Sequence, residues 1–279
     1  MTKILVTTDF SVNSKKGVLF AMQLAKQTQC ELIFYNVVKI FRPTIWDNVY
    51  YEEFEIKEIT RSQKFLEKFI SDLFLKTKIT NVTYKCVCEV AMVASNQIIG
   101  YAKTSKAHYI CVSTVGEGKL NQLFGTTASE LITFSPTPVI IVPQNYRIKT
   151  INSLFFASDF KNFDAEFKKI EQFTIPLRAI LNVYHYDYSS FLEINNNKFS
   201  KLIKNHESKN IHFHLRPLDS GTPLLDHLEK DILIAKPSMV VVFTKQNRNW
   251  FNRMFLSSLS AELAFDTKTP MLVFKKRVA

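Results

Sequence analysis

The stretch Ile-Leu-Val-Thr-Thr-Asp-Phe at residues 4–10 occurs again, in altered form, as Leu-Phe-Phe-Ala-Ser-Asp-Phe at residues 154–160. In both copies an apolar run ends in a small hydroxyl residue, an aspartate and a phenylalanine. A second pair of stretches also matches, with Ser-Glu-Leu and Thr-Pro-Val-Ile (129–140) resembling Ala-Glu-Leu and Thr-Pro-Met-Leu (261–272). Two copies of one domain are the simplest explanation. We expect domain 1 at residues 1–146 and domain 2 at residues 147–279.

Short apolar runs alternate with helical patterns in both copies. The run Val-Ile-Ile-Val at 139–142 is apolar on both faces, as expected of a parallel strand covered by helices on both sides. Residues 50–77 carry phenylalanines and leucines at helical spacing. The pattern predicts an α/β fold of two tandem, open, doubly wound, Rossmann-like parallel sheets. Predicted strands span 3–8, 31–38, 82–88, 109–113, 138–142, 152–157, 179–185, 211–216, 239–243 and 271–274, and predicted helices of the first copy span 12–28, 50–77, 92–105 and 124–134.

Composition excludes several classes of protein. The 279 residues are 46% hydrophobic and 22% charged, which is ordinary for a globular core. No apolar run reaches the roughly 18 residues of a membrane span, so no membrane association is predicted. The net charge of +11 is spread over both halves, and the densest basic cluster, residues 275–277, is interpreted as a solvated tail. A nucleic-acid partner is not predicted, because that would require a concentrated basic face.

The four cysteines point to a reducing compartment. Cys30, Cys86, Cys88 and Cys111 all lie in the first half and lack the C-x-x-C spacing of a zinc or redox site. They are interpreted as reduced thiols that serve as small hydrophobic side chains. The chain enters its first strand without a signal-peptide pattern. A cytoplasmic location is predicted.

Three of the six glycines fall in one short stretch. Gly116, Gly118 and Gly125 lie between the apolar run 109–112 and a helical pattern that opens near Thr126. A glycine-rich turn between a strand and a helix exposes backbone N–H groups and a helix N-terminus, which together can surround a phosphate. The carboxyl ends of the strands, where ligands bind in open α/β sheets, also carry Asp9. The turn is therefore a candidate phosphate site.

Together these segments resemble the universal stress protein family. The resemblance rests on residues 4–11, on Asn-Val-Val at 36–38, and on the glycine turn before Thr-Pro-Val-Ile-Ile-Val-Pro at 137–143. It implies a stress-response regulator with an adenine nucleotide alpha hydrolase-like fold. It also implies ATP or AMP with Mg²⁺ as cofactor, with adenosine near the aspartate and the second strand, and phosphates in a turn of pattern G-x2-G-x9-G-[ST].

The first copy matches this pattern in part. Ser113 stands in place of the first glycine of the pattern. Gly116 matches the second glycine and Gly125 the third, and eight residues instead of nine separate them. A serine forced to positive φ at that place would cost about 1–2 kcal/mol. The resemblance implies a nucleotide site formed by Thr7, Asp9, Val37, Ser113, Gly116, Gly125 and Thr126.

The second copy departs much further. Asp159 remains, but residues 243–250 contain no glycine, and the final pair becomes Ser257 and Ser258. We expect this half to have lost the nucleotide site, so that one chain holds at most one nucleotide. An aspartate between a strand and a helix often only caps the helix, and this interpretation is open for Asp9 as well.

Two other functions remain open from the sequence. One is an interaction scaffold of the same fold that binds an unknown protein partner and no nucleotide. The other is an enzyme, at most a slow ATP hydrolase, although no general base or catalytic residue stands out. His212 and His214 share a strand face, with His185 or His227 nearby, but the polar face of an edge strand explains them without a metal.

The last strand of each copy predicts how the copies assemble. In this family two domains commonly pair through their final strands in antiparallel fashion. Here those strands are 139–142 and 271–274, both short and apolar. Because an unpaired apolar edge favours aggregation, we expect the chain to form an intramolecular pseudo-dimer. A homodimer formed through other surfaces is a further alternative.

Overall fold

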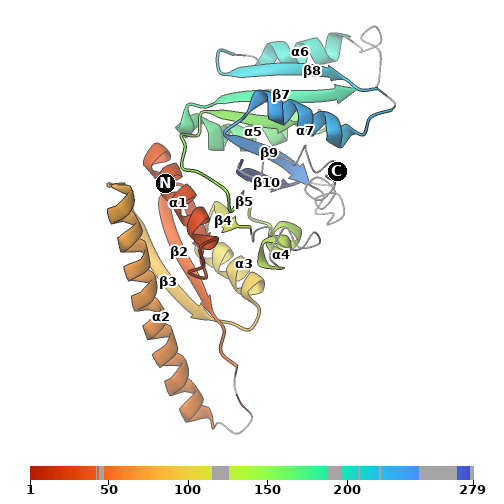
Figure 1. Ribbon diagram of the computed structural model, residues 1–279. Helices are drawn as coiled ribbons and strands as arrows, with labels where there is room; N and C mark the ends of the chain where they lie inside the picture. Colours follow the sequence, from red (N-terminus) through yellow and green to blue (C-terminus); the bar gives the residue numbers. More distant parts are fainter. Residues whose placement is uncertain are drawn as a thin grey trace.

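All ten predicted strands are present in the computed structural model, which describes residues 1–41, 43, 47–114, 126–187, 196–206, 208–219, 221–244 and 269–276 (Figure 1). Predicted and observed boundaries agree within two residues. The first half consists of β1 (Lys3–Thr7), α1 (Ser14–Thr28), β2 (Glu31–Val38), α2 (Asn48–Thr77), β3 (Tyr84–Val90), α3 (Ala94–Thr104), β4 (Tyr109–Ser113), α4 (Thr126–Phe134) and β5 (Val139–Val142). The second half consists of β6 (Ser153–Ala157), α5 (Phe163–Thr174), the short 3-10 helix η1 (Ile175–Leu177), β7 (Ile180–Asp187), α6 (Asn196–His206), β8 (Ile211–Pro217), α7 (Leu224–Ala235), β9 (Met239–Thr244) and β10 (Met271–Lys275).

The strands of each half are parallel and have equivalent orders. In the first half the order is β3-β2-β1-β4-β5, and in the second half it is β8-β7-β6-β9-β10. The order reverses between β1 and β4, and again between β6 and β9. These are the places where a doubly wound sheet opens a crevice at its carboxyl edge.

Helices cover both faces of the sheet, as the apolar strands require. On one face α1, α2 and α5 pack on side chains such as Val6, Phe34 and Phe156. On the other face α3, α4 and α7 pack on Leu5 and Ile33 and on their neighbours. Alternate residues of one strand thus belong to two separate core layers, which explains why the strands read as unbroken apolar runs.

The two halves join into one ten-stranded sheet through β5 and β10. These strands are antiparallel, with Ile140 opposite Leu272 and Ile141 opposite Met271. Each final strand thereby gains a partner on its open side. The predicted pairing of final strands within one chain is confirmed.

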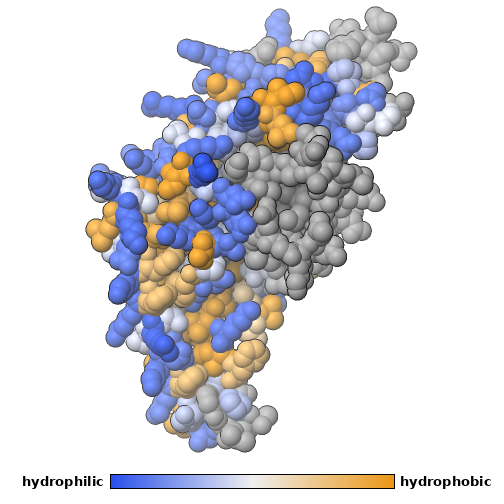
Figure 2. All heavy atoms as spheres, viewed as in Figure 1, coloured by the Kyte–Doolittle hydropathy of each residue, from blue (hydrophilic) through white to orange (hydrophobic). Residues whose placement is uncertain are grey.

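The long helix α2 is largely exposed. Only Leu66, Ile70 and Leu73 are buried along its 30 residues. Val49 and Ile56 leave about two thirds of their surface open, and hydrophobic side chains interrupt the hydrophilic surface in the lower part of the molecule, where α2 lies (Figure 2). None of the described helices is long and apolar enough to cross a membrane.

Candidate functional site

The carboxyl ends of β1, β2 and β4 meet at one edge of the sheet in the first half. Because β1 lies between β2 and β4, this edge brings together Asp9 after β1, Val37 near the end of β2, and Ser113 at the end of β4. Gly116 and Gly125 lie outside the described residues, and Thr126 is described only as the first residue of α4. The structure therefore gathers the strand-end part of the predicted site.

A tight turn after β1 presents the carboxylate of Asp9. Phe10 has a left-handed backbone with φ 66°, and its N–H donates to Thr8 Oγ1 at 3.1 Å. The N–H of Ser11 donates to Asp9 Oδ1 at 3.0 Å. Helix α1 begins only at Ser14, so Asp9 belongs to an Asx turn and does not cap the helix. The helix-cap interpretation of Asp9 is wrong.

The charge state of Asp9 follows from its neighbours. Burial raises the pKa of this carboxyl, but hydrogen-bond donors of Ser11 and Ser14 outweigh burial and hold the pKa below its ordinary value. The carboxylate is therefore ionised at neutral pH. It stands exposed at the sheet edge, where it can accept hydrogen bonds from a ligand.

The other strand-end residues are held by the sheet. Thr7 is buried, and its hydroxyl donates to the Cys111 carbonyl at 3.4 Å. Its side chain therefore links β1 to β4. Val37 is half-buried on β2. Next to it, Asn36 was missed by the sequence interpretation: its Nδ2 donates to the Thr8 carbonyl at 2.8 Å and ties β2 to the turn.

Ser113 contacts helix α1. Its Oγ accepts the N–H of Gly17 at 2.7 Å and donates to the Ser14 carbonyl at 3.4 Å. Ser113 is not among the described residues with positive φ, so the strain considered for a serine at this place does not arise. A Cβ on Gly17 would lie only 2.6 Å from Ser113 Oγ. The glycine and the serine are therefore matched to each other.

This match predicts a non-additive pair of substitutions. Gly17→Ala should destabilise the protein by about 1–3 kcal/mol through overpacking, and Ser113→Ala by about 1 kcal/mol through the lost hydrogen bond. The double variant should lose less than the sum, because removing Oγ makes room for the new Cβ. Urea unfolding of the three variants measures this coupling. Strictly additive losses would show that the two residues act independently.

The turn after β6 repeats the hydrogen bonds of the turn after β1. The N–H of Phe160 donates to Ser158 Oγ at 3.1 Å, and the N–H of Lys161 donates to Asp159 Oδ1 at 3.2 Å. Phe160 also has a left-handed backbone, with φ 57°. His185 Nδ1 lies 2.8 Å from the Ser158 carbonyl and closes the turn as Asn36 does in the first half. The repeat seen in the sequence therefore extends to the geometry of both turns.

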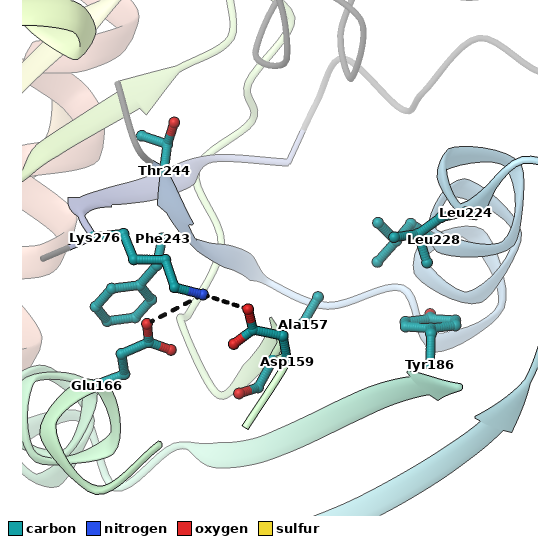
Figure 3. A pocket seen from close by; sticks show the side chains of 10 residues that line it. Ala157, Asp159, Glu166, Tyr186, Leu224, Leu228, Phe243, Thr244 and Lys276 are labelled. Atoms are coloured by element: carbon teal, nitrogen blue, oxygen red, sulfur yellow. Dashed lines mark hydrogen bonds and ion pairs between the residues drawn. The ribbon is translucent and has the colours of Figure 1, made fainter. Parts of the chain in front are cut away.

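A cavity of about 400 Å³ lies at the carboxyl ends of β6, β7 and β9. Leu224 and Leu228 of α7 and the ring of Tyr186 form one side, and Asp159 and Lys276 lie across from them (Figure 3). Thus the second half has a hollow at the place equivalent to the predicted site of the first half. Its expected failure to bind a nucleotide stays a prediction, since most of its loop after β9 lies outside the described residues.

Lys276 bridges two carboxylates at this cavity (Figure 3). Its Nζ lies 2.7 Å from Asp159 Oδ2 and 3.7 Å from Glu166 Oε1, and its side chain is only 15% exposed. The interpretation of Lys276 as part of a solvated tail is therefore wrong. Burial raises the pKa of Asp159, but Lys276 and Lys161 outweigh it and keep the pKa below its usual value. Burial raises the pKa of Glu166, and Lys276 offsets this only in part.

The histidine pair lies on the edge strand β8, as its polar alternation predicts. His214 Nε2 lies 3.0 Å from Asn182 Oδ1, and its ring stacks on Tyr184 with centroids 4.4 Å apart. Within the described part of the chain, no group of three or more histidine, cysteine or acidic side chains is arranged to hold a metal ion.

Fold and topology define a tandem α/β protein in which the strand order reverses once in each half. The model of the universal stress protein family matches residues 1–143, slightly more than half of the chain. The chain therefore belongs to the universal stress protein family, as a tandem two-domain member. No curated protein matches it.

Solved structures of similar proteins share the whole fold. A universal stress protein from Archaeoglobus fulgidus DSM 4304 is 13% identical, covers 99% of this chain and 98% of its own, and has a TM-score of 0.70. A protein described as a universal stress protein from Pseudomonas aeruginosa UCBPP-PA14 is 14% identical, covers 99% of this chain and 93% of its own, and has a TM-score of 0.58. At these identities the likeness establishes the tandem fold alone.

Proposed function

We propose that this chain is a stress-response regulator that binds one adenine nucleotide in its first half. The observation that carries the proposal is the open carboxylate of Asp9 at the edge where β1, β2 and β4 end. Among the described residues no ion pair involves Asp9, whereas the equivalent Asp159 is paired with Lys276. The family match also falls on the first half.

Sheet register explains why the two aspartates differ. Ser113 lies opposite Val142 in the first half, and Phe243 lies opposite Phe274 in the second. Gln144 lies two residues after Val142, and Lys276 lies two residues after Phe274. The uncharged Gln144 offers no ammonium to Asp9, and this leaves the carboxylate available to a ligand.

Each part of the proposed site has a distinct role. The family resemblance assigns the adenosine to Asp9 and to the backbone at Val37. It assigns the phosphates and Mg²⁺ to the glycine turn that leads to Thr126. Helix α4 begins at Thr126, and the N-terminus of a helix favours an anion. Binding and regulation require no catalytic residue. The four thiols are free in the structure, in keeping with the proposed cytoplasmic location.

Calorimetric titration of the full chain with Mg-ATP tests the proposal. We expect one site per chain, and a stabilisation of about 2.7 kcal/mol when free ligand is at ~100 times its dissociation constant. Asp9→Asn should weaken binding about tenfold, because hydrogen bonds to a charged acceptor contribute about 1.5–3 kcal/mol. The matched control Asp159→Asn should leave the affinity unchanged.

Three outcomes of this titration would contradict the proposal. Two equivalent sites would show that the second half binds nucleotide as well. Equal losses in the two aspartate variants would place the ligand elsewhere. No binding by the folded chain would favour the scaffold that holds a protein partner. Phosphate release above background at steady state would add a slow hydrolase activity to a binding protein.

A further inference from the structure

The cavity of the second half has an apolar side and a charged side. Leu224 and Leu228 of α7 form the apolar side, and the ring of Phe243 from β9 lies near the charged groups (Figure 3). A volume of about 400 Å³ lies within the usual range of small-molecule sites. The arrangement suits a ligand with an apolar body and one polar head.

Glu166 leaves one polar atom of this cavity unsatisfied. The residue is only 5% exposed, and its Oε1 has no hydrogen-bond partner among the described residues. The ammonium of Lys276, 3.7 Å away, lies beyond hydrogen-bond distance. A buried carboxylate with an unsatisfied oxygen is costly, so a ligand that brings an N–H donor to this carboxylate would gain from it.

The charges of the lining favour a cationic donor. Asp159 and Glu166 contribute two carboxylates, and Lys276 is the single ammonium among the described lining residues. Lys161 and Lys169 act on these carboxylates from outside the lining. Within the lining itself, a bound monocation would balance two negative charges with two positive ones, whereas an anion would add a third negative charge.

We propose that the second half binds a small primary amine with an apolar body in this cavity. The ammonium group donates to the carboxylate of Glu166 beside Asp159, and the apolar body lies against Leu224 and Leu228. Lys276 keeps its 2.7 Å contact with Asp159. The site is separate from the nucleotide site proposed for the first half, and it needs neither a glycine turn nor a phosphate.

Three probes of similar shape and different charge test this proposal on the full chain. They are 2-phenylethylamine, 2-phenylethanol and phenylacetate, titrated by calorimetry at neutral pH. We expect the amine to bind at least about tenfold more tightly than the alcohol, because charge-assisted hydrogen bonds are roughly twice as strong as neutral ones. Phenylacetate should bind most weakly.

Variants locate the bound amine. Glu166→Gln should weaken amine binding about tenfold or more, because it removes the charge that the ammonium needs. Glu171→Gln, on the same helix but outside the lining, is the matched control and should bind as the unchanged protein does. Leu224→Trp should block the cavity, and because Leu224 is 42% exposed the larger side chain does not disturb the core.

The proposal is overturned by any of three results. These are absence of amine binding by the folded chain, an alcohol or anion that binds as tightly as the amine, and an affinity that Glu166→Gln and Leu224→Trp leave unchanged. Mg-ATP binding should be the same in every one of these variants. The two sites can thus fail or succeed independently.

Discussion

Residues 1–146 expressed alone are expected to dimerise or aggregate, while the full chain satisfies the same edge internally. In the full chain β5 is completely buried and pairs on its outer side with β10. Without the second half, this short apolar strand presents unpaired N–H and C=O groups. Two fragments can cover these groups by pairing β5 with β5, because the natural contact is already antiparallel.

Contacts outside the sheet strengthen this expectation. The ring of Tyr109 packs edge-on against Phe173 of α5, with centroids 5.2 Å apart. Gln27 of α1 exchanges two hydrogen bonds with the backbone of Ile151. Tyr146, by contrast, packs on Phe20 of the first half. We therefore propose the domain boundary after residue 146. A cut at this place keeps Tyr146 with the core of the first half and exposes the surface that contacts the second half.

Light scattering after size-exclusion chromatography measures the mass of the fragment over a range of concentrations. The full chain at equal concentrations is the control, and circular dichroism verifies that the fragment is folded. Association that grows with concentration supports the expectation, because the fragment lacks the covalently linked β10 that pairs with β5 in the full chain. A folded, stable monomer at every concentration would show that β5 needs no partner.

Most of the fold could be predicted from the sequence because its signals are local. A strand that is buried on both faces, such as β5, appears in the sequence as an apolar run. The repeat at residues 4–10 and 154–160 indicates that both halves share one order of elements, so a strand recognised in one half supports its counterpart in the other. Strand β3 begins two residues later than predicted, at Tyr84, where its exposed start weakens the apolar signal. The pairing of the final strands followed from the family resemblance and from their unpaired apolar edges.

The candidate sites were less predictable, because their contacts join residues far apart in the chain. Lys276 and Asp159 are 117 residues apart, and a lysine in a basic cluster near residue 279 is typical of a solvated tail. Ser113 and Gly17 are 96 residues apart. No local pattern indicates that the hydroxyl of Ser113 occupies the space that a Cβ on Gly17 would need. The cavity of the second half was hard to predict for the same reason, since α7, α5 and the residue after β10 meet only in the folded chain.

Gly116→Asp should abolish nucleotide binding while the fold survives. Gly116 lies outside the described residues, in the turn after β4 to which the proposal assigns the phosphates. An aspartate there adds a Cβ where the backbone must approach the ligand and a negative charge beside the phosphates. Two like charges at ~4 Å repel by roughly 4 kcal/mol at an effective dielectric constant of about 20. This corresponds to about a thousandfold in Kd.

Gly100→Asp is the matched control for the added charge. A Cβ at Gly100 meets nothing within 4 Å, and this residue lies exposed on α3. We expect this variant to bind Mg-ATP as the unchanged chain does. Gly125→Val should lose binding without any added charge, because a branched side chain crowds the end of the same turn. Calorimetry and thermal unfolding of all three variants separate lost binding from lost stability. If Gly116→Asp and Gly125→Val both keep the full affinity, the phosphates do not lie in this turn.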